Sequence, residues 1–154
     1  MPVQIRRATE RDVDALERFE RAAFVSYYSR HRFSKREFAY YVKSGVTDTY
    51  VAIKHGRVLG YVLGSQRRGS HRHVGRLLSI AVASTDRAQG IGTRLLRRFL
   101  RAARERGCRR VYLEVALPNV TAINLFVANG FKRVRQLPRY YTSRVHALRM
   151  RVVL

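Results

Sequence analysis

The chain has 154 residues, of which 46% are hydrophobic and 27% are charged, a balance typical of one globular domain over 1–154 and unlike that of a disordered chain. Its 32 Lys and Arg outnumber its 10 Asp and Glu, giving a formal charge of +22, so its surface attracts phosphates and acidic partners. No apolar run reaches the roughly 18 residues of a membrane span, and the start of the chain lacks the apolar segment of a signal peptide, so a cytoplasmic protein without membrane contact is expected.

The first third of the chain predicts a strand followed by two helices. Residues 3–7 alternate as in a strand, and apolar residues recur at helical spacing over residues 10–23. Ser34 is suited to cap a second helix over residues 35–43. The aromatic segment between the helices, residues 24–33, has no clean periodicity and is expected to form a loop or a short helix.

The middle of the chain predicts three strands and then a long helix. Residues 49–54 and 58–66 are rich in β-forming residues and flank a His-Gly turn, which predicts a hairpin. Residues 74–83 form a third, longer strand. Residues 92–106 have one apolar face and one face of arginines, as expected of a helix that packs on a sheet.

The last third predicts a strand, a helix and two more strands, over residues 110–117, 119–129, 131–136 and 146–153. The whole order is β-α-α-β-β-β-α-β-α-β-β. Strands joined by short turns pair antiparallel, whereas the β-α-β unit in the middle requires a parallel crossover. We therefore expect an α/β fold with one mixed, mostly antiparallel sheet of about seven strands and helices on both faces.

Two glycines, Gly90 and Gly92, lie at the turn between the third strand and the long helix. Glycine lets the backbone adopt positive φ and approach a ligand closely. The start of the helix adds unpaired N–H groups and the positive end of the helix dipole, so the turn predicts an anion site suited to a pyrophosphate. The loop lacks the P-loop pattern G-x-x-x-x-G-K-[ST], and Leu95 stands where the dinucleotide fingerprint would have its third glycine.

Cysteine and histidine give weaker signals. The single cysteine, Cys108, cannot form an internal disulfide, and no base at a motif spacing accompanies it. His71 and His73 share a strand face, but no third ligand has motif spacing, so no metal site is expected.

Four sequence segments resemble one known family. The segment RAQGIG (87–92) matches the pattern R/Q-x-x-G-x-G/A that opens a helix in the GNAT acetyltransferases, and SIAV (79–82) resembles the strand before it. The segment LEVALPNVTAINLFVANGF (113–131) is similar to protein N-terminal acetyltransferases, including the ribosomal-protein-alanine enzymes and their archaeal relatives. The pair of tyrosines in PRYY (138–141) resembles one that these relatives carry before the last strand. The resemblance covers most of the chain and implies the GNAT fold.

The resemblance also implies acetyl-CoA as co-substrate. It would be held by the backbone of one strand, by the loop and helix start that follow, and by two residues of the next helix. These residues are Ile80, Ala81, Val82, Arg87, Ala88, Gln89, Gly90, Ile91, Gly92, Thr93, Asn119 and Phe126.

Direct acetyl transfer requires a neutral amine and a proton for the departing thiolate. Glu114 matches the general base of the ribosomal-protein-alanine enzymes, and an ion-paired structural residue is the alternative interpretation. Phe126 departs from the family, which usually places a tyrosine there as general acid, so another group donates this proton or the thiolate leaves unaided. Tyr140 and Tyr141 are candidates for substrate contact or proton delivery.

The acceptor side is less well defined by the sequence. Phe24, Tyr27 and Tyr28 lie in the region where the family binds acceptors, and we expect them to line the acceptor groove. The segment TSRVHA (142–147) replaces an acidic G-E-D-A stretch found in several relatives, which leaves the family's peptide preference open for this chain.

The leading hypothesis is an N-acetyltransferase that moves acetyl from acetyl-CoA to a protein amine, at an N-terminal α-amine. The alternatives are a lysine or small-amine acetyltransferase, and a non-catalytic module that binds acetyl-CoA or RNA. Phe126 favours the module, whereas the intact RAQGIG and Glu114 disfavour it. The expected partner is a protein or peptide acceptor, and contact with RNA or the ribosome through the basic surface is a further hypothesis. Monomer and homodimer both stay open.

Overall fold

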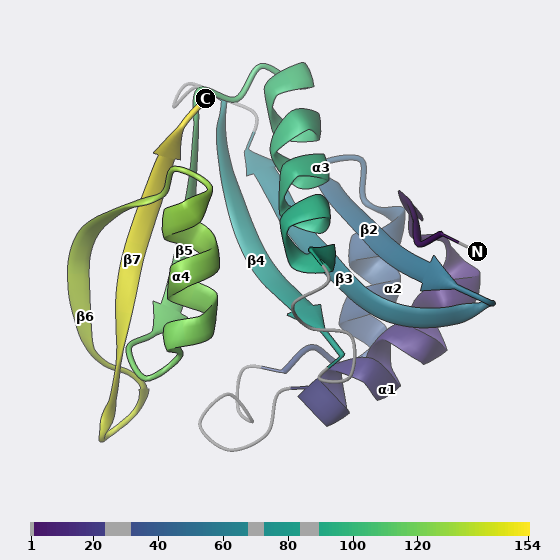
Figure 1. Cartoon of the computed structure of the whole chain (residues 1–154), viewed down its shortest axis with the longest axis horizontal. Helices are drawn as coiled ribbons and strands as arrows, with labels where there is room; N and C mark the ends of the chain where they lie inside the picture. The colour runs from purple at the N-terminus through teal and green to yellow at the C-terminus, as the bar shows by residue number, and fades with distance from the viewer. Residues whose placement is uncertain (1, 24–31, 68–72, 84–89) are drawn as a thin grey trace.

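The computed structural model describes residues 2–23, 32–67, 73–83 and 90–154, which form one seven-stranded sheet with helices on both faces (Figure 1). The elements, in chain order, are β1 Gln4–Arg7, the 3-10 helix Glu10–Asp12, α1 Val13–Ala23, α2 Lys35–Lys43, β2 Thr47–Lys54, β3 Arg57–Arg67, β4 Val74–Val82, α3 Ile91–Glu105, β5 Arg110–Ala116, α4 Val120–Ala128, β6 Lys132–Thr142 and β7 Val145–Val153.

The strand order is β1-β2-β3-β4-β5-β7-β6, and β4 and β5 are its parallel pair. These two strands pair only where Val74, Gly75 and Arg76 face residues 110–112. Beyond that point β4 and β5 diverge, as Figure 1 shows, because β4 continues along β3 while β5 continues along β7. The sheet is therefore open between the C-terminal ends of β4 and β5.

Helices α3 and α4 cover one face of the sheet, and α1 and α2 cover the other (Figure 1). Leu95, Leu96 and Phe99 of α3 are completely buried against the first face. On the opposite face, Leu16 of α1 and Phe38 of α2 pack in a second buried cluster around strands β2 to β4. The amphipathic patterns of the sequence therefore account for both cores.

The structure confirms the expected fold class and the parallel crossover, and it changes some element bounds. The helix expected over residues 10–23 begins as a single 3-10 turn before α1. Ser34 caps α2 as expected, since its Oγ accepts a hydrogen bond from the Glu37 N–H at 3.2 Å.

The strand expected over residues 131–136 is longer in the structure. β6 extends to Thr142, past Pro138, and pairs with β7 on one side in the sheet order, so the missing proline N–H removes no bond from a second neighbour. The register shifts between Leu137 and Thr142, and Arg139 in this interval has a φ of 56°. Tyr140 and Tyr141 lie in this irregular stretch, and Tyr141 contacts β5.

No helix in the described part of the chain is both long and apolar enough to cross a membrane.

Candidate active site

A cavity of about 250 Å³ lies where β4 and β5 diverge. Its walls come from β4 at residues 76–80, from β5 at residues 113–115 and from α4 at Asn119, Ala122 and Phe126. Tyr140 and Tyr141 close another side. Glu114, Tyr140, Tyr141, Asn119, Phe126 and Ile80, which the sequence nominated separately, thus border one space.

The turn before α3 has the backbone expected of an anion site. Gly90 adopts a φ of 76° at the N-cap, a conformation that favours glycine. The first helical hydrogen bond runs from the Arg94 N–H to the Gly90 carbonyl at 3.0 Å, so the N–H groups of Ile91, Gly92 and Thr93 precede the helical ladder. Three further candidates in this turn, residues 87–89, lie outside the described residues.

Ile80, Ala81 and Val82 form the last part of β4 and pair with β3. They follow the point where β4 stops pairing with β5, so this end of β4 borders the opening between the strands. An extended chain laid along that border would meet backbone groups of β4, as in strand addition.

Glu114 lies on β5 with its side chain only 6% exposed. One carboxylate oxygen forms an ion pair with the Arg76 guanidinium, and the other with Arg149 Nε at 3.0 Å. These arginines come from β4 and β7, the two neighbours of β5 in the sheet. Glu114, which the sequence suggested as a general base, therefore lies at the cavity wall. It is also ion-paired with two arginines, as expected if its role were structural.

The two tyrosines differ in their contacts. Tyr141 is buried, and its hydroxyl donates a hydrogen bond to the Glu114 backbone carbonyl at 3.2 Å. Tyr140 is 37% exposed, and its ring packs edge-on against Tyr141 with 4.9 Å between centroids. Tyr141 thus fixes the end of β6 against β5, while Tyr140 presents more surface at the cavity.

Asn119 and Phe126 border the cavity from α4. The Asn119 side-chain oxygen caps the helix by accepting from the Ala122 N–H at 3.2 Å. Phe126 is buried against Phe131, with 5.6 Å between ring centroids. Its ring gives the cavity an apolar wall and no hydroxyl.

The structure adds a residue that the sequence did not nominate, Glu20 of α1. Glu20 is 1% exposed and borders the same cavity from the other side of the sheet. Its carboxylate accepts hydrogen bonds from the Tyr61 hydroxyl and from the Phe33 N–H, the latter at 2.8 Å. Burial raises the pKa of Glu20, and these two hydrogen bonds oppose the rise. The sequence does contain a signal for this residue. Glu20 lies four residues after Leu16, so it is on the buried, apolar face of α1.

Other sequence candidates lie outside this geometry. Phe24, Tyr27 and Tyr28, expected in the acceptor groove, lie outside the described residues. In the part of the chain that the structure describes, no three His, Cys, Asp or Glu side chains are grouped as metal ligands. Cys108 is buried, and burial raises the pKa of its thiol.

Comparison with known proteins identifies the family. Residues 13–131 match the model of the Acetyltransferase (GNAT) family. An N-alpha-acetyltransferase of Sulfolobus acidocaldarius is 34% identical over 149 residues, which cover 91% of this chain and 86% of that protein. N-alpha-acetyltransferase 30 of Schizosaccharomyces pombe is 30% identical over 119 residues, covering 76% of this chain and 79% of the relative.

Solved structures agree with these relatives. A ribosomal-protein-alanine N-acetyltransferase from Brucella melitensis is 28% identical with a TM-score of 0.79, covering 98% of this chain and 99% of that one. Ard1 from Thermoplasma volcanium has the same fold, with 24% identity, a TM-score of 0.86 and coverage of 100% and 99%. The chain is a member of the GNAT family and an N-acetyltransferase.

Proposed function

We propose that this protein transfers acetyl from acetyl-CoA directly to the N-terminal α-amine of a protein or peptide. The observation that carries the proposal is the cavity at the divergence of β4 and β5, bordered by Glu114 and the two tyrosines. Relatives named N-alpha-acetyltransferase over most of the chain support the α-amine as acceptor.

The residues present fit acetyl-CoA. The N-terminus of α3, with Gly90 in the left-handed conformation, offers backbone donors and a positive dipole end to the pyrophosphate, and Arg87, Ala88 and Gln89 are proposed to complete this loop. The end of β4 at 80–82 is proposed to align the pantetheine arm, with Asn119 and Phe126 on its other side. The co-substrate supplies a thioester whose carbonyl carbon the amine attacks.

Glu114 is proposed to take a proton from the acceptor amine. Each of its oxygens is engaged by one arginine, and a carboxylate has about four lone-pair directions, so capacity remains for a further donor. Arg76 and Arg149 hold the carboxylate at the cavity wall, which fixes its position relative to an incoming amine. Tyr140 is proposed to contact the acceptor, together with Phe24, Tyr27 and Tyr28.

The test is thiol release from acetyl-CoA with short peptides that differ in their first residue, beside N-terminally blocked peptides that contain lysine. We expect turnover with free N-termini only, and a loss of turnover in Glu114→Gln. Turnover of the blocked lysine peptides would show that the acceptor is a lysine side-chain amine instead. Tight acetyl-CoA binding without turnover of any peptide would instead support the small-amine or binding-module alternatives.

A second proposal concerns the basic surface, because the charge is distributed unevenly. No Asp or Glu follows Glu114 in the sequence. Where β5, β7 and β6 lie side by side, Tyr112 is opposite Arg151, which is opposite Lys132. These residues alternate with the buried Leu113 and Met150, so they lie on the face away from α3 and α4. Helices α1 and α2 pack chiefly on the other half of that face, against β2 to β4.

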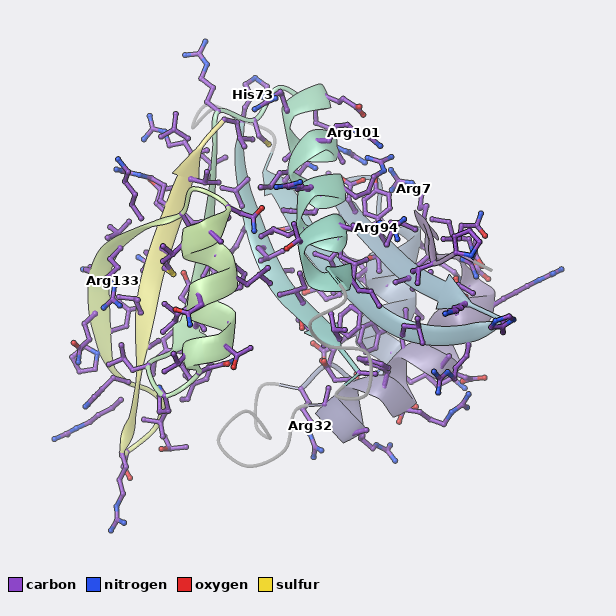
Figure 2. The ribbon with its side chains drawn as sticks, in the orientation of Figure 1. Arg7, Arg32, His73, Arg94, Arg101 and Arg133 are labelled. Atoms are coloured by element: carbon purple, nitrogen blue, oxygen red, sulfur yellow. The ribbon has the colours of Figure 1, made fainter. Side chains whose placement is uncertain are left out.

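We propose that this half-face contacts single-stranded RNA. Arg110 and Arg151 hydrogen-bond Tyr112 and lower the pKa of its hydroxyl, and an aromatic ring among arginines is suited to base stacking with phosphate contact. Figure 2 shows other basic side chains, Arg94 and Arg101, beside α3. The test measures RNA affinity at several salt concentrations. In the double variant Arg110→Gln/Arg151→Gln, the slope of log affinity against log salt concentration should become shallower by about 0.7 per arginine. The control variant Arg94→Gln/Arg101→Gln should keep the wild-type slope. Equal losses in both pairs, or no RNA retention, would refute this proposal.

A further inference from the structure

A chain of hydrogen-bonded side chains connects the cavity to a buried carboxylate. Ser79 of β4 borders the cavity, and its Oγ lies 2.7 Å from the hydroxyl oxygen of Tyr61 on β3. The Tyr61 hydroxyl donates in turn to Glu20 on α1. This series of hydrogen bonds therefore joins β4, β3 and α1. Ser79 and Glu20, at its two ends, both border the cavity.

An irregularity in β4 gives Ser79 its place in this chain. Leu63 of β3 pairs with Ser79, whereas the next residue, Gly64, pairs with Leu77, so Leu78 is an extra residue in β4. A bulge of this kind redirects the side chains that follow it. Ser79 thereby lies on the same face as Tyr61 while it remains half-buried at the cavity wall.

Packing alone does not account for a carboxylate at position 20. Tyr61 is completely buried between the rings of Phe19 and Phe38, at centroid distances of 6.0 and 5.6 Å. A carboxylate buried at such a place costs folding free energy unless it is paired. In the described part of the chain its hydrogen-bond donors are the Tyr61 hydroxyl and the Phe33 N–H, which are both neutral.

Among the described residues, two charged groups act on Glu20, namely Arg32 and Glu37. Arg32 attracts its carboxylate and Glu37 repels it, and both act more weakly than the desolvation caused by burial. Burial therefore raises the pKa of Glu20 above its ordinary value, which makes its carboxylate a better proton acceptor than an exposed one.

We propose that Ser79, Tyr61 and Glu20 form a proton relay that serves acetyl transfer in the cavity. This inference rests on the proposed function. An α-ammonium group has three protons and the product amide has one, so two protons leave the nitrogen. Glu114 takes one of them and passes it to water.

The relay carries the other proton. Ser79 Oγ accepts it from the nitrogen while its own proton passes to the Tyr61 oxygen, and the Tyr61 proton passes to Glu20. As the C–N bond forms and the C–S bond breaks, Glu20 returns the proton along the same chain to the sulfur, which becomes S–H. One N–H bond is lost and one S–H bond is gained. This path supplies the proton that the ring of Phe126 cannot give.

The test uses variants that interrupt the hydrogen-bonded series at its middle, Tyr61, and at one of its ends, Ser79. Tyr61→Phe keeps the buried ring and removes only the hydroxyl, and Ser79→Ala removes the donor at the cavity wall. The matched control is Tyr50→Phe, which deletes the hydroxyl of another buried tyrosine, one that packs in the α3 core and accepts from Arg7 at 3.0 Å. Steady-state rates are measured from pH 5 to 10 with acetyl-CoA and a peptide that the wild type acetylates.

We expect Tyr61→Phe and Ser79→Ala each to lower kcat about 100-fold, which is at the lower end of the effect of general acid–base groups. KM for both substrates should stay within about twofold, and the acid limb of the kcat profile should change position in both variants. Tyr50→Phe should keep the wild-type kcat and profile.

Wild-type kcat and an unchanged pH profile in Tyr61→Phe and Ser79→Ala would overturn the relay. A loss that appears only in KM, or equally in Tyr50→Phe, would also overturn it, because it would report disturbed packing. Failure of the proposed function is a different result, namely a wild-type protein that turns over no peptide, and it would remove the relay as well.

Discussion

Gly90 allows a direct test of the α3 N-terminus as the pyrophosphate site. Among the residues that the structure describes, and apart from its chain neighbours, the Cβ of Gly90→Ala would meet no atom within 4 Å, so a clash with those residues is not the cause of the expected effect. The cause is the φ of 76°, since the left-handed conformation costs an L-residue about 1–2 kcal/mol. If acetyl-CoA binding requires this conformation, the same free energy appears as a roughly 5- to 30-fold rise in Kd.

Gly56 provides the matched control. It has a φ of 72° and equally open surroundings, but it lies in the turn between β2 and β3, away from the cavity. Gly56→Ala should lower the free energy of unfolding by about the same 1–2 kcal/mol and leave the Kd for acetyl-CoA unchanged. Gly90→Asn should bind acetyl-CoA more tightly than Gly90→Ala, because asparagine tolerates the left-handed conformation. Isothermal titration with acetyl-CoA and urea unfolding measure both quantities. A wild-type Kd in Gly90→Ala, or an equal rise in Gly56→Ala, would refute the reasoning.

Three further predictions concern the site and the fold. Glu114→Gln should lower kcat about 100-fold with little change in KM, and unchanged initial rates of thiol release would exclude Glu114 as a proton acceptor. Gly64→Ala should destabilise the protein by roughly 1–3 kcal/mol or more in urea unfolding, because its Cβ would lie 2.1 Å from Phe99 Cζ. Gly64→Ala/Phe99→Leu should recover part of that loss, and an unaltered unfolding midpoint in Gly64→Ala would contradict the packing. Because burial raises the pKa of folded Glu20 above its unfolded value, its contribution favours folding most below the unfolded pKa and declines as pH rises through the interval up to the folded pKa. The unfolding free energy of the wild type should therefore fall relative to Glu20→Gln as pH rises through that interval, and a constant difference would contradict the assignment.

Local sequence patterns predict the elements around the site because they depend on local physics. The apolar stripe of α3 and the glycine turn before it both follow from residues close in the sequence. The parallel crossover follows from chain connectivity between β4 and β5. The fold and the position of the candidate pyrophosphate loop could therefore be predicted without coordinates.

The partners of the buried carboxylates could not be predicted in the same way. Glu114 is paired with Arg149 because β7 lies between β5 and β6, an order that the alternation of the strands does not reveal. The chain from Glu20 to Ser79 depends on the bulge at Leu78, which no turn residue announces. Both features arise from contacts between distant strands and helices.

The extension of β6 also depends on long-range pairing. The sequence predicted a strand that ends at residue 136, and Pro138 lies two residues beyond that end. In the structure the edge position tolerates the proline, and the hairpin with β7 closes between Thr142 and Val145. That hairpin places Tyr141 against the Glu114 carbonyl.

The most direct test of the central claim uses one peptide that carries both a free α-amine and an internal lysine. The purified protein is incubated with this peptide and acetyl-CoA, and fragmentation mass spectrometry locates the acetyl group. We expect the acetyl group on the α-amine, with the lysine unmodified. Acetylation of the lysine with the α-amine left free would contradict the account.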